Sequence, residues 1–296
     1  MSLPIFFDTL IEGLSTGCIF ALVAVSINIM YRPSRAFNFG QGEFVLLGGV
    51  LSLLFLNSWH WPWLAAVPVL MLIGAALGGL TDLIAIRPVI SRSATSSAWV
   101  ITTLALSLIL DDEIGARFTG ATAVVPVPPL LTTTPMNIGS AQVSSYQIAL
   151  LVLTVLIVIG LWFAYRTRHG LAIMALSEDR EAALLRGVPA GRLNLVSWMA
   201  GGALAALVGV LAAPITQVSS GLGFELLIDG FIAAAIGGIG DNRGALVGGL
   251  VVGLAQSFGA VVFGPLYQDL ASFVVFLVLL GLRPRGVLGE ARVREV

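Results

Sequence analysis

Long apolar runs set the limits on what this 296-residue chain can fold into. Several runs approach 20 residues, the length of helix that crosses the hydrocarbon layer of a bilayer. Charged residues make up only 10% of the sequence, against about 25% in a soluble globular domain. At roughly 30 residues for each span with its loop, about nine helices fit. We therefore expect an all-α integral membrane protein, a polytopic bundle of about 8–10 transmembrane helices.

Polar breaks between the apolar runs predict where each span ends. Asn38 and Gln41 have the spacing of a capping box, so a helix should start there. The stretch 116–144 is rich in Thr, Pro and Ser without a helical period, which predicts an extended external loop. The seventh run is short and broken by glycine, so a re-entrant segment is an alternative to a full span. The predicted spans are 6–30, the Asn38 cap to about 56, 64–86, 97–110, 146–165, 193–213, 224–240, 245–263 and 266–282.

The distribution of arginine predicts the orientation. All 15 basic residues are arginine, because the sequence contains no lysine. Basic loops face the cytoplasm, so the longest polar segment, 166–192, should be cytoplasmic. Alternating spans then leave only Arg117 outside, with the C-terminus inside and, for an odd number of spans, the N-terminus outside. The arginines of the polar segment are Arg166, Arg168, Arg180, Arg186 and Arg192.

Composition argues against several classes of function. A Walker A loop needs a lysine, so we expect no nucleotide site in this chain. The net charge of −1 gives no electrostatic case for nucleic acid. His60 and His169 do not have metal-ligand spacing, and we find no convergent catalytic set. We therefore expect neither an enzyme nor a metal or cofactor site.

Segment 166–192 contains a short helix with recognisable ends. Ser177 is its expected N-cap, Glu178 and Asp179 are acids of its first turn, and Gly187 should stop it. Such a helix is either a connection resting on the bilayer interface or a docking helix for a soluble subunit. Ala182, Ala183 and Leu185 should form its apolar face. The candidate docking residues are Ser177, Glu178, Arg180, Glu181, Ala182, Leu185 and Gly187.

Acids and amides at membrane depth are the candidate functional groups. A charge at the bilayer centre costs about 3 kcal/mol or more, so such groups are usually paired or line water. Asp82 has Arg87 as a nearby partner. Glu43 could pair with Arg32 or Arg35, and Asp229 could be an interfacial acid. The alternative is a place on a translocation path, for which the candidates are Asn38, Gln41, Glu43 and Asp229.

Glycines on both sides of one short turn, 241–244, give the strongest packing signal. Glycines four apart permit close approach of two helices, which predicts a tight helical hairpin. The same turn has the form of a phosphate nest, but we favour packing. The candidate packing residues are Gly237, Gly238, Gly240, Gly244, Gly248 and Gly249.

Several motifs together resemble one family. Residues 38–43 read Asn-Phe-Gly-Gln-Gly-Glu, similar to the Asn-Phe-Ala-His-Gly-Glu signature of branched-chain amino-acid ABC transporter permeases of the H type. Three further segments resemble the same family and occur in the same order along the chain. They are Arg87-Pro88, segment 235–249 and segment 283–289. Residues 181–187 fit the Glu-Ala-Ala-x-x-x-Gly loop of many ABC permeases, without its Ile-x-Leu-Pro end. Gln41 replaces the usual histidine, so no titrating role is expected there.

The resemblance implies an ABC importer permease of the branched-chain amino-acid and ribose type. Residues 1–296 would form a single transmembrane permease domain, with an external loop at about 116–144 and a cytoplasmic coupling segment at about 166–192. It would form half of a path for branched-chain amino acids or a related amide or urea-like solute, by alternating access. The implied partners are a second related permease, two cytoplasmic ABC ATPases that bind the ATP, an extracytoplasmic substrate-binding protein and the lipid of a bacterial inner membrane.

Two other classes of membrane protein remain as alternatives. A self-contained secondary transporter or channel would move solute without partners, but it would normally need several facing carboxylates at membrane depth. A purely structural membrane partner would not need the ordered family motifs.

Overall fold

The computed structural model describes residues 2–92, 98–118, 125–138, 141–216, 218–219, 221–284 and 286–288. The described chain is mostly helical and divides into two compact units. The division falls within α1 (Leu3–Ser34), α6 (Ser145–Ala164) and α10 (Leu222–Gly237). Unit 1 consists of Met1–Val25, Pro129–Val158 and Asp229–Val296, and unit 2 consists of Ser26–Pro128 and Ile159–Ile228.

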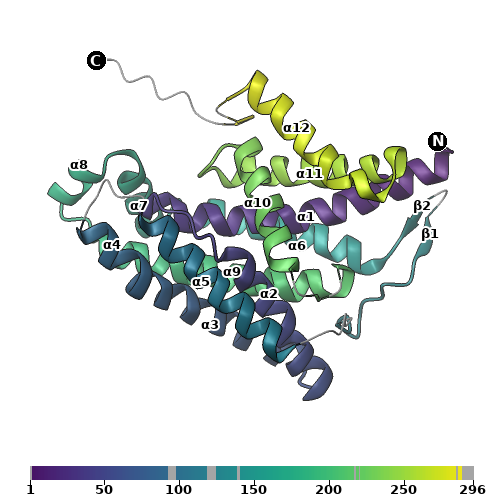
Figure 1. The fold of residues 1–296 in the computed structure, drawn as a ribbon, viewed down its shortest axis with the longest axis horizontal. Coiled ribbons are helices and arrows are strands. Elements are labelled where there is room, and N and C mark those ends of the chain that lie inside the picture. Colours follow the sequence, from purple (N-terminus) through teal and green to yellow (C-terminus); the bar gives the residue numbers. More distant parts are fainter. Residues whose placement is uncertain are drawn as a thin grey trace. The chain divides into compact units, whose positions relative to one another are not determined.

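Unit 2 is built around α9 (Ala190–Thr216), against which α2 (Gln41–Ser52) and α3 (Trp63–Thr81) pack (Figure 1). Gly74 of α3 meets Gly202 of α9 backbone to backbone, because a Cβ on either residue would overlap the carbonyl oxygen of the other. Small residues thus allow the close approach that membrane helices need in order to gain contact. The remaining elements are η1 (Leu53–Ser58), η2 (Asp82–Ile86), α4 (Arg87–Arg92), α5 (Ala98–Arg117), α7 (Arg168–Glu178) and α8 (Arg180–Leu185).

Unit 1 pairs the first part of α1 with α11 (Asn242–Phe263), and α11 also packs on α12 (Gln268–Leu282). Gly17 lies against Gly249, where an added Cβ would be 2.9 Å from the Gly249 carbonyl oxygen. The unit also holds η3 (Pro265–Tyr267) and two antiparallel strands, β1 (Met136–Ile138) and β2 (Ala141–Val143), with Met136 opposite Val143. Asp8 Oδ1 accepts a hydrogen bond of 2.7 Å from the Gln142 amide, which ties β2 to the start of α1.

The helical membrane class is confirmed, but the predicted spans need corrections. In the described part of the chain, seven helical stretches are long and apolar enough to cross a membrane. Two of the nine predicted spans do not qualify. Helix α5 continues past residue 110 to Arg117 and so includes three acids, and α10 has only 16 residues. The predicted extended loop contains β1 and β2, where apolar residues alternate with polar ones.

Candidate functional site

The polar segment contains two short helices rather than one. Thr167 caps α7, its Oγ1 accepting from the Gly170 amide at 3.3 Å. Asp179, not Ser177, caps α8, its Oδ1 accepting from the Ala182 amide at 3.0 Å. The Ser177 hydroxyl donates instead to the Met174 carbonyl, and Glu178 is the last residue of α7. The N-cap prediction at Ser177 was therefore wrong, because that residue completes the preceding helix.

The end of α8 follows the prediction. Gly187 has φ +79°, a left-handed conformation that glycine adopts without strain. The Gly187 amide donates to the Leu184 carbonyl at 2.9 Å, and the Val188 amide donates to the Ala183 carbonyl at 3.1 Å. These two bonds form a Schellman motif, which satisfies carbonyls at the end of the helix.

Only part of the predicted apolar face of α8 is buried, and the rest is exposed. Ala183 is buried in a small cluster with Leu176, Ala190 and Leu193, and Ala182 is half-buried. Leu185 points away and is 90% exposed. Arg180 and Glu181 are also exposed, so one face of α8 presents a leucine beside charged groups.

Arginines connect this segment to the end of α1 within unit 2. The Arg35 guanidinium donates to the Ser177 carbonyl, and Arg180 Nη1 donates to the Pro33 carbonyl at 3.4 Å. Arg32 lies over the Tyr165 ring at 4.7 Å. Helix C-terminal carbonyls have no intrahelical partner and favour cations, so these contacts join two helix ends.

Asn38 and Gln41 are fully enclosed by protein partners. Gln41 Nε2 donates to Ser26 Oγ at 2.8 Å and to the Gly201 carbonyl at 3.3 Å. Asn38 Nδ2 donates to Gln41 Oε1 at 3.0 Å. Helix α2 begins at Gln41 with Gly40 as N-cap and without a side-chain cap, so the predicted capping box is absent. The two amides instead join the end of α1, the following loop and α9.

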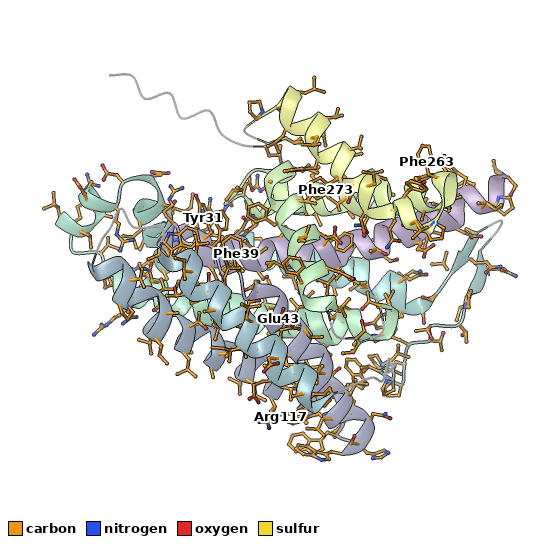
Figure 2. The ribbon with its side chains drawn as sticks, in the orientation of Figure 1. Tyr31, Phe39, Glu43, Arg117, Phe263 and Phe273 are labelled. Carbon is orange, nitrogen blue, oxygen red and sulfur yellow. The ribbon has the colours of Figure 1, made fainter. Side chains whose placement is uncertain are left out.

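Glu43 lies in the first turn of α2 (Figure 2). The residue is 3% exposed. Its Oε2 is buried without a hydrogen-bond partner among the described residues. The predicted pairing with Arg32 or Arg35 does not occur in the described structure, because those arginines contact the Tyr165 ring and the Ser177 carbonyl. Helix α5 approaches this segment, because a Cβ on Gly40 would lie 3.7 Å from the Thr103 oxygen and the Ser107 nitrogen of the backbone.

The other two acids at membrane depth have partners. Asp82 Oδ2 accepts from Arg87 Nε at 2.9 Å, and Arg87 Nη2 donates to the Gly191 carbonyl at 2.6 Å. Asp229 Oδ1 accepts from Gln256 Nε2 at 2.8 Å. Asp82 Oδ1 is also buried without a hydrogen-bond partner among the described residues, but the other oxygen of Asp82 pairs with Arg87, whereas no ion pair is described for Glu43.

The glycine-rich segment forms a close contact between α10 and α11. A Cβ on Gly244 would overlap the Gly237 carbonyl, and one on Gly248 would overlap the Ala233 carbonyl. Gly249 faces α1 at Ala21 instead. Gly238 and Gly240 have φ +105° and +92°, so they supply the turn itself. The turn lies at 238–241 rather than 241–244, because Asp241 caps α11 by accepting from the Arg243 amide at 2.8 Å.

Two sets of contacts at the site were not predicted from the sequence. The first is the binding of backbone carbonyls by Arg35 and Arg180, although their places beside helix ends were a usable signal. The second is the contribution of α5 to the surroundings of Glu43, for which the sequence gives no signal.

Parts of the closing family motif and the tail, residues 285 and 289–296, lie outside the described residues. No cluster of three or more His, Cys, Asp or Glu that could hold a metal occurs in the described part of the chain.

Comparison with known proteins gives full-length matches. BraD of Pseudomonas aeruginosa, a high-affinity branched-chain amino acid transport system permease protein, is 29% identical over 98% of both chains. LivH of Escherichia coli, with the same description, is 28% identical over 98% of both chains. The ribose import permease protein RbsC of Haemophilus influenzae is 23% identical, covering 93% of this chain and 85% of that protein.

A solved structure and a family model extend these matches. The structure of PsaBC from Streptococcus pneumoniae in complex with Fab has a TM-score of 0.52 at 16% identity, covering 95% of this chain and 92% of that one, which shows a shared fold. Residues 9–282 match the model of the family described as branched-chain amino acid transport system / permease component. This chain therefore belongs to that family of transport permeases.

Proposed function

We propose that this permease forms half of the translocation path of an ATP-driven importer for branched-chain amino acids or a related small amide or urea-like solute. A second related permease would supply the other half, two cytoplasmic ABC ATPases would bind the ATP, and an extracytoplasmic binding protein would deliver the solute. The full-length similarity to BraD and LivH supports the substrate class. The chain itself would hold no cofactor.

The exposed face of α8 is the observation that carries the coupling role. Leu185 is 90% exposed beside Arg180 and Glu181, whereas Ala183 holds α8 to α7 and α9. An exposed leucine with charged neighbours suits the edge of an apolar groove on a soluble partner. Movement of α8 would reach α1 through the carbonyl contacts of Arg35 and Arg180.

Two local contacts support the proposed orientation, with the C-terminus cytoplasmic and the N-terminus external. Within unit 1, Asp8 near the start of α1 bonds to Gln142 in the predicted external loop. Within unit 2, Arg35 after the end of α1 bonds to the predicted cytoplasmic segment at Ser177. Each end of α1 thus lies with the polar segment expected on its side.

Purification of the chain from its native membrane in mild detergent tests the proposal. Co-purification of two P-loop ATPases and a second permease, with ATP-dependent leucine uptake after reconstitution, is the expected result. A chain that purifies alone and moves solute down an ion gradient would replace the proposal with the secondary-transporter alternative.

A further inference from the structure

The turn between α6 and α7 places positive charge directly at the end of a membrane span. Helix α6 is long and apolar enough to cross a membrane, and it ends at Ala164. Arg166 and Arg168 follow within four residues, and both are exposed. No carboxylate of the described chain forms an ion pair with either arginine. The two charges are therefore available to an anion from outside the chain.

This turn is tightly built. The Thr167 hydroxyl donates to the Ala164 carbonyl at 2.7 Å and accepts from the Gly170 amide at 3.3 Å. A Cβ on Gly170 would overlap the Ala164 carbonyl oxygen and Tyr165 Cα, so the first turn of α7 packs directly on the end of α6. The turn therefore keeps Arg166 and Arg168 beside the end of the span.

Aromatic rings position two guanidinium groups at this end. Arg166 Cζ lies 3.6 Å from the centre of the Trp162 ring, and Arg32 Cζ lies 4.7 Å from the centre of the Tyr165 ring. Trp162 and Tyr165 are three residues apart, a spacing that places them on one side of a helix. Contact with a ring holds a guanidinium in place without a carboxylate, so its charge is not cancelled.

The neighbouring side chains are typical of a lipid environment. Phe163 is 58% exposed and Ile159 is 45% exposed, and both lie on α6 just before the arginines. Exposed apolar groups on a membrane span face acyl chains, and tryptophan and tyrosine are typical of the membrane–water interface. Basic groups directly beyond the end of a span attract the anionic headgroups of lipids.

The proposed docking surface for the ATPase lies elsewhere on the same segment. Leu185 belongs to α8, which follows α7, whereas Arg168 is the first residue of α7. Helix α7 has 11 residues and is therefore about 16 Å long. The two ends of α7 thus carry different surfaces, one beside a membrane span and one beside the exposed leucine.

We propose that Arg166 and Arg168 bind the phosphate of an anionic phospholipid at the membrane surface where α6 ends. Guanidinium groups match phosphate oxygens in geometry and charge. Arg32 adds positive charge nearby, and Trp162 and Phe163 contact the glycerol and the upper acyl chain. The lipid would anchor the start of α7 to the bilayer, so that a movement of α8 turns about a fixed end.

The test titrates the complete complex, in mixed detergent micelles, with phosphatidylglycerol that carries brominated acyl chains. Bromine quenches tryptophan fluorescence on contact, so Trp162 reports lipid bound at the turn, and Trp162→Phe identifies its share of the quenching. Arg166→Gln combined with Arg168→Gln should weaken the apparent affinity by about 25-fold, about fivefold for each arginine. If this double variant does not assemble, Arg168→Gln alone should weaken it by about fivefold, and a change below about twofold would overturn the inference.

The matched control is Arg186→Gln combined with Arg192→Gln, which removes two exposed arginines from the same polar segment. Its affinity should stay within about twofold of the wild type, because neither arginine adjoins the end of α6. Equal weakening by the two double variants would overturn the inference, since total charge would then decide the binding.

Three further outcomes would also overturn it. Brominated phosphatidylcholine that binds as tightly would show that the headgroup charge is not recognised. Full competition by glycerol 3-phosphate at the same concentration would assign the arginines to a soluble phosphate. Unchanged quenching with loss of the ATPase subunits from the Arg166→Gln and Arg168→Gln double variant would assign them to a protein contact.

Discussion

Arg35 and Arg180 each donate a hydrogen bond to a backbone carbonyl near the end of a helix. In each case, that helix precedes the other arginine in the chain. Arg35 follows α1 and binds the Ser177 carbonyl in α7, while Arg180 opens α8 and binds the Pro33 carbonyl in α1. The two contacts cross between the same pair of chain segments. A displacement of α8 should therefore move the end of α1. Asn38 and Gln41 lie shortly after this end in the chain.

Replacement of these arginines should weaken coupling. Arg35→Gln and Arg180→Gln are each expected to lower binding-protein-stimulated ATP hydrolysis by about three- to fivefold, the effect of losing one hydrogen bond with a net contribution of about 1 kcal/mol. The double variant should lose clearly less than the product of the single effects, because both contacts join the same elements. Arg117→Gln is the control on an exposed pair. Fully multiplicative losses would show that the contacts act independently.

Leu185→Asp should weaken docking of the ATPase subunits without unfolding the permease. The side chain is 90% exposed, so its loss removes little from the protein's own core. Recovery of ATPase in a pull-down should fall by about tenfold, as for a central interface residue. Leu130→Asp is the matched control, because Leu130 is 94% exposed in the predicted external loop. Equal recovery with both variants would remove α8 from the docking surface.

Gly244→Ala should destabilise the contact between α10 and α11 by about 1–3 kcal/mol, since its Cβ would overlap the Gly237 carbonyl. Gly160→Ala is the control, because nothing lies within 4 Å of a Cβ at that helical position. Thermal unfolding in detergent should show a lower midpoint for Gly244→Ala only. Matching midpoints would show that the contact between α10 and α11 accommodates a methyl group without strain.

Arg87→Ala should destabilise the fold far more than Arg117→Ala. Asp82 has a side chain that is 0% exposed, so loss of Arg87 would leave a buried charge without its partner, at about 3–5 kcal/mol. The Glu113–Arg117 pair is exposed on both sides, and its loss should cost about 1 kcal/mol or less. The difference between the two unfolding midpoints measures this contrast, and similar midpoints would contradict it.

Cysteine labelling should establish the orientation. A membrane-impermeant maleimide added outside intact cells should label Leu130→Cys but not Arg186→Cys, and inverted vesicles should give the reverse. The native Cys18 is 1% exposed and should stay unlabelled in both. Labelling of Arg186→Cys from outside would reverse the proposed topology.

The sequence predicted the helices well where composition alone decides them. Most apolar runs became helices within a few residues of the expected ends, because a bilayer requires long hydrogen-bonded apolar segments. Two of the predicted spans, α5 and α10, do not have the length and composition of a membrane-crossing helix, although α10 forms close to its predicted bounds as a short helix. Helix α5 continues through three acids, and the short α10 relies on close glycine contacts rather than length.

The site was less predictable, because its properties depend on pairing between distant segments. The Asp82–Arg87 pair is five residues apart and could be anticipated. The absence of a hydrogen-bond partner for Glu43 Oε2 among the described residues could not be anticipated, because it depends on which groups Arg32 and Arg35 contact and on which face of α5 approaches. Likewise, the choice of Asp179 over Ser177 as cap depends on where α7 ends, which is a matter of one or two residues.

Two carbonyls at the end of α10 accept hydrogen bonds from residues that are synthesised much later in the chain. The Val287 amide donates to the Ile236 carbonyl at 2.8 Å, and the Leu288 amide donates to the Gly237 carbonyl at 3.2 Å. During synthesis, these two carbonyls remain without these partners until about 50 further residues have been made, which takes several seconds at about 5–20 residues per second. A nascent chain stalled after α12 would therefore contain all the long apolar helices of the described chain, while the end of α10 would still lack these two hydrogen bonds.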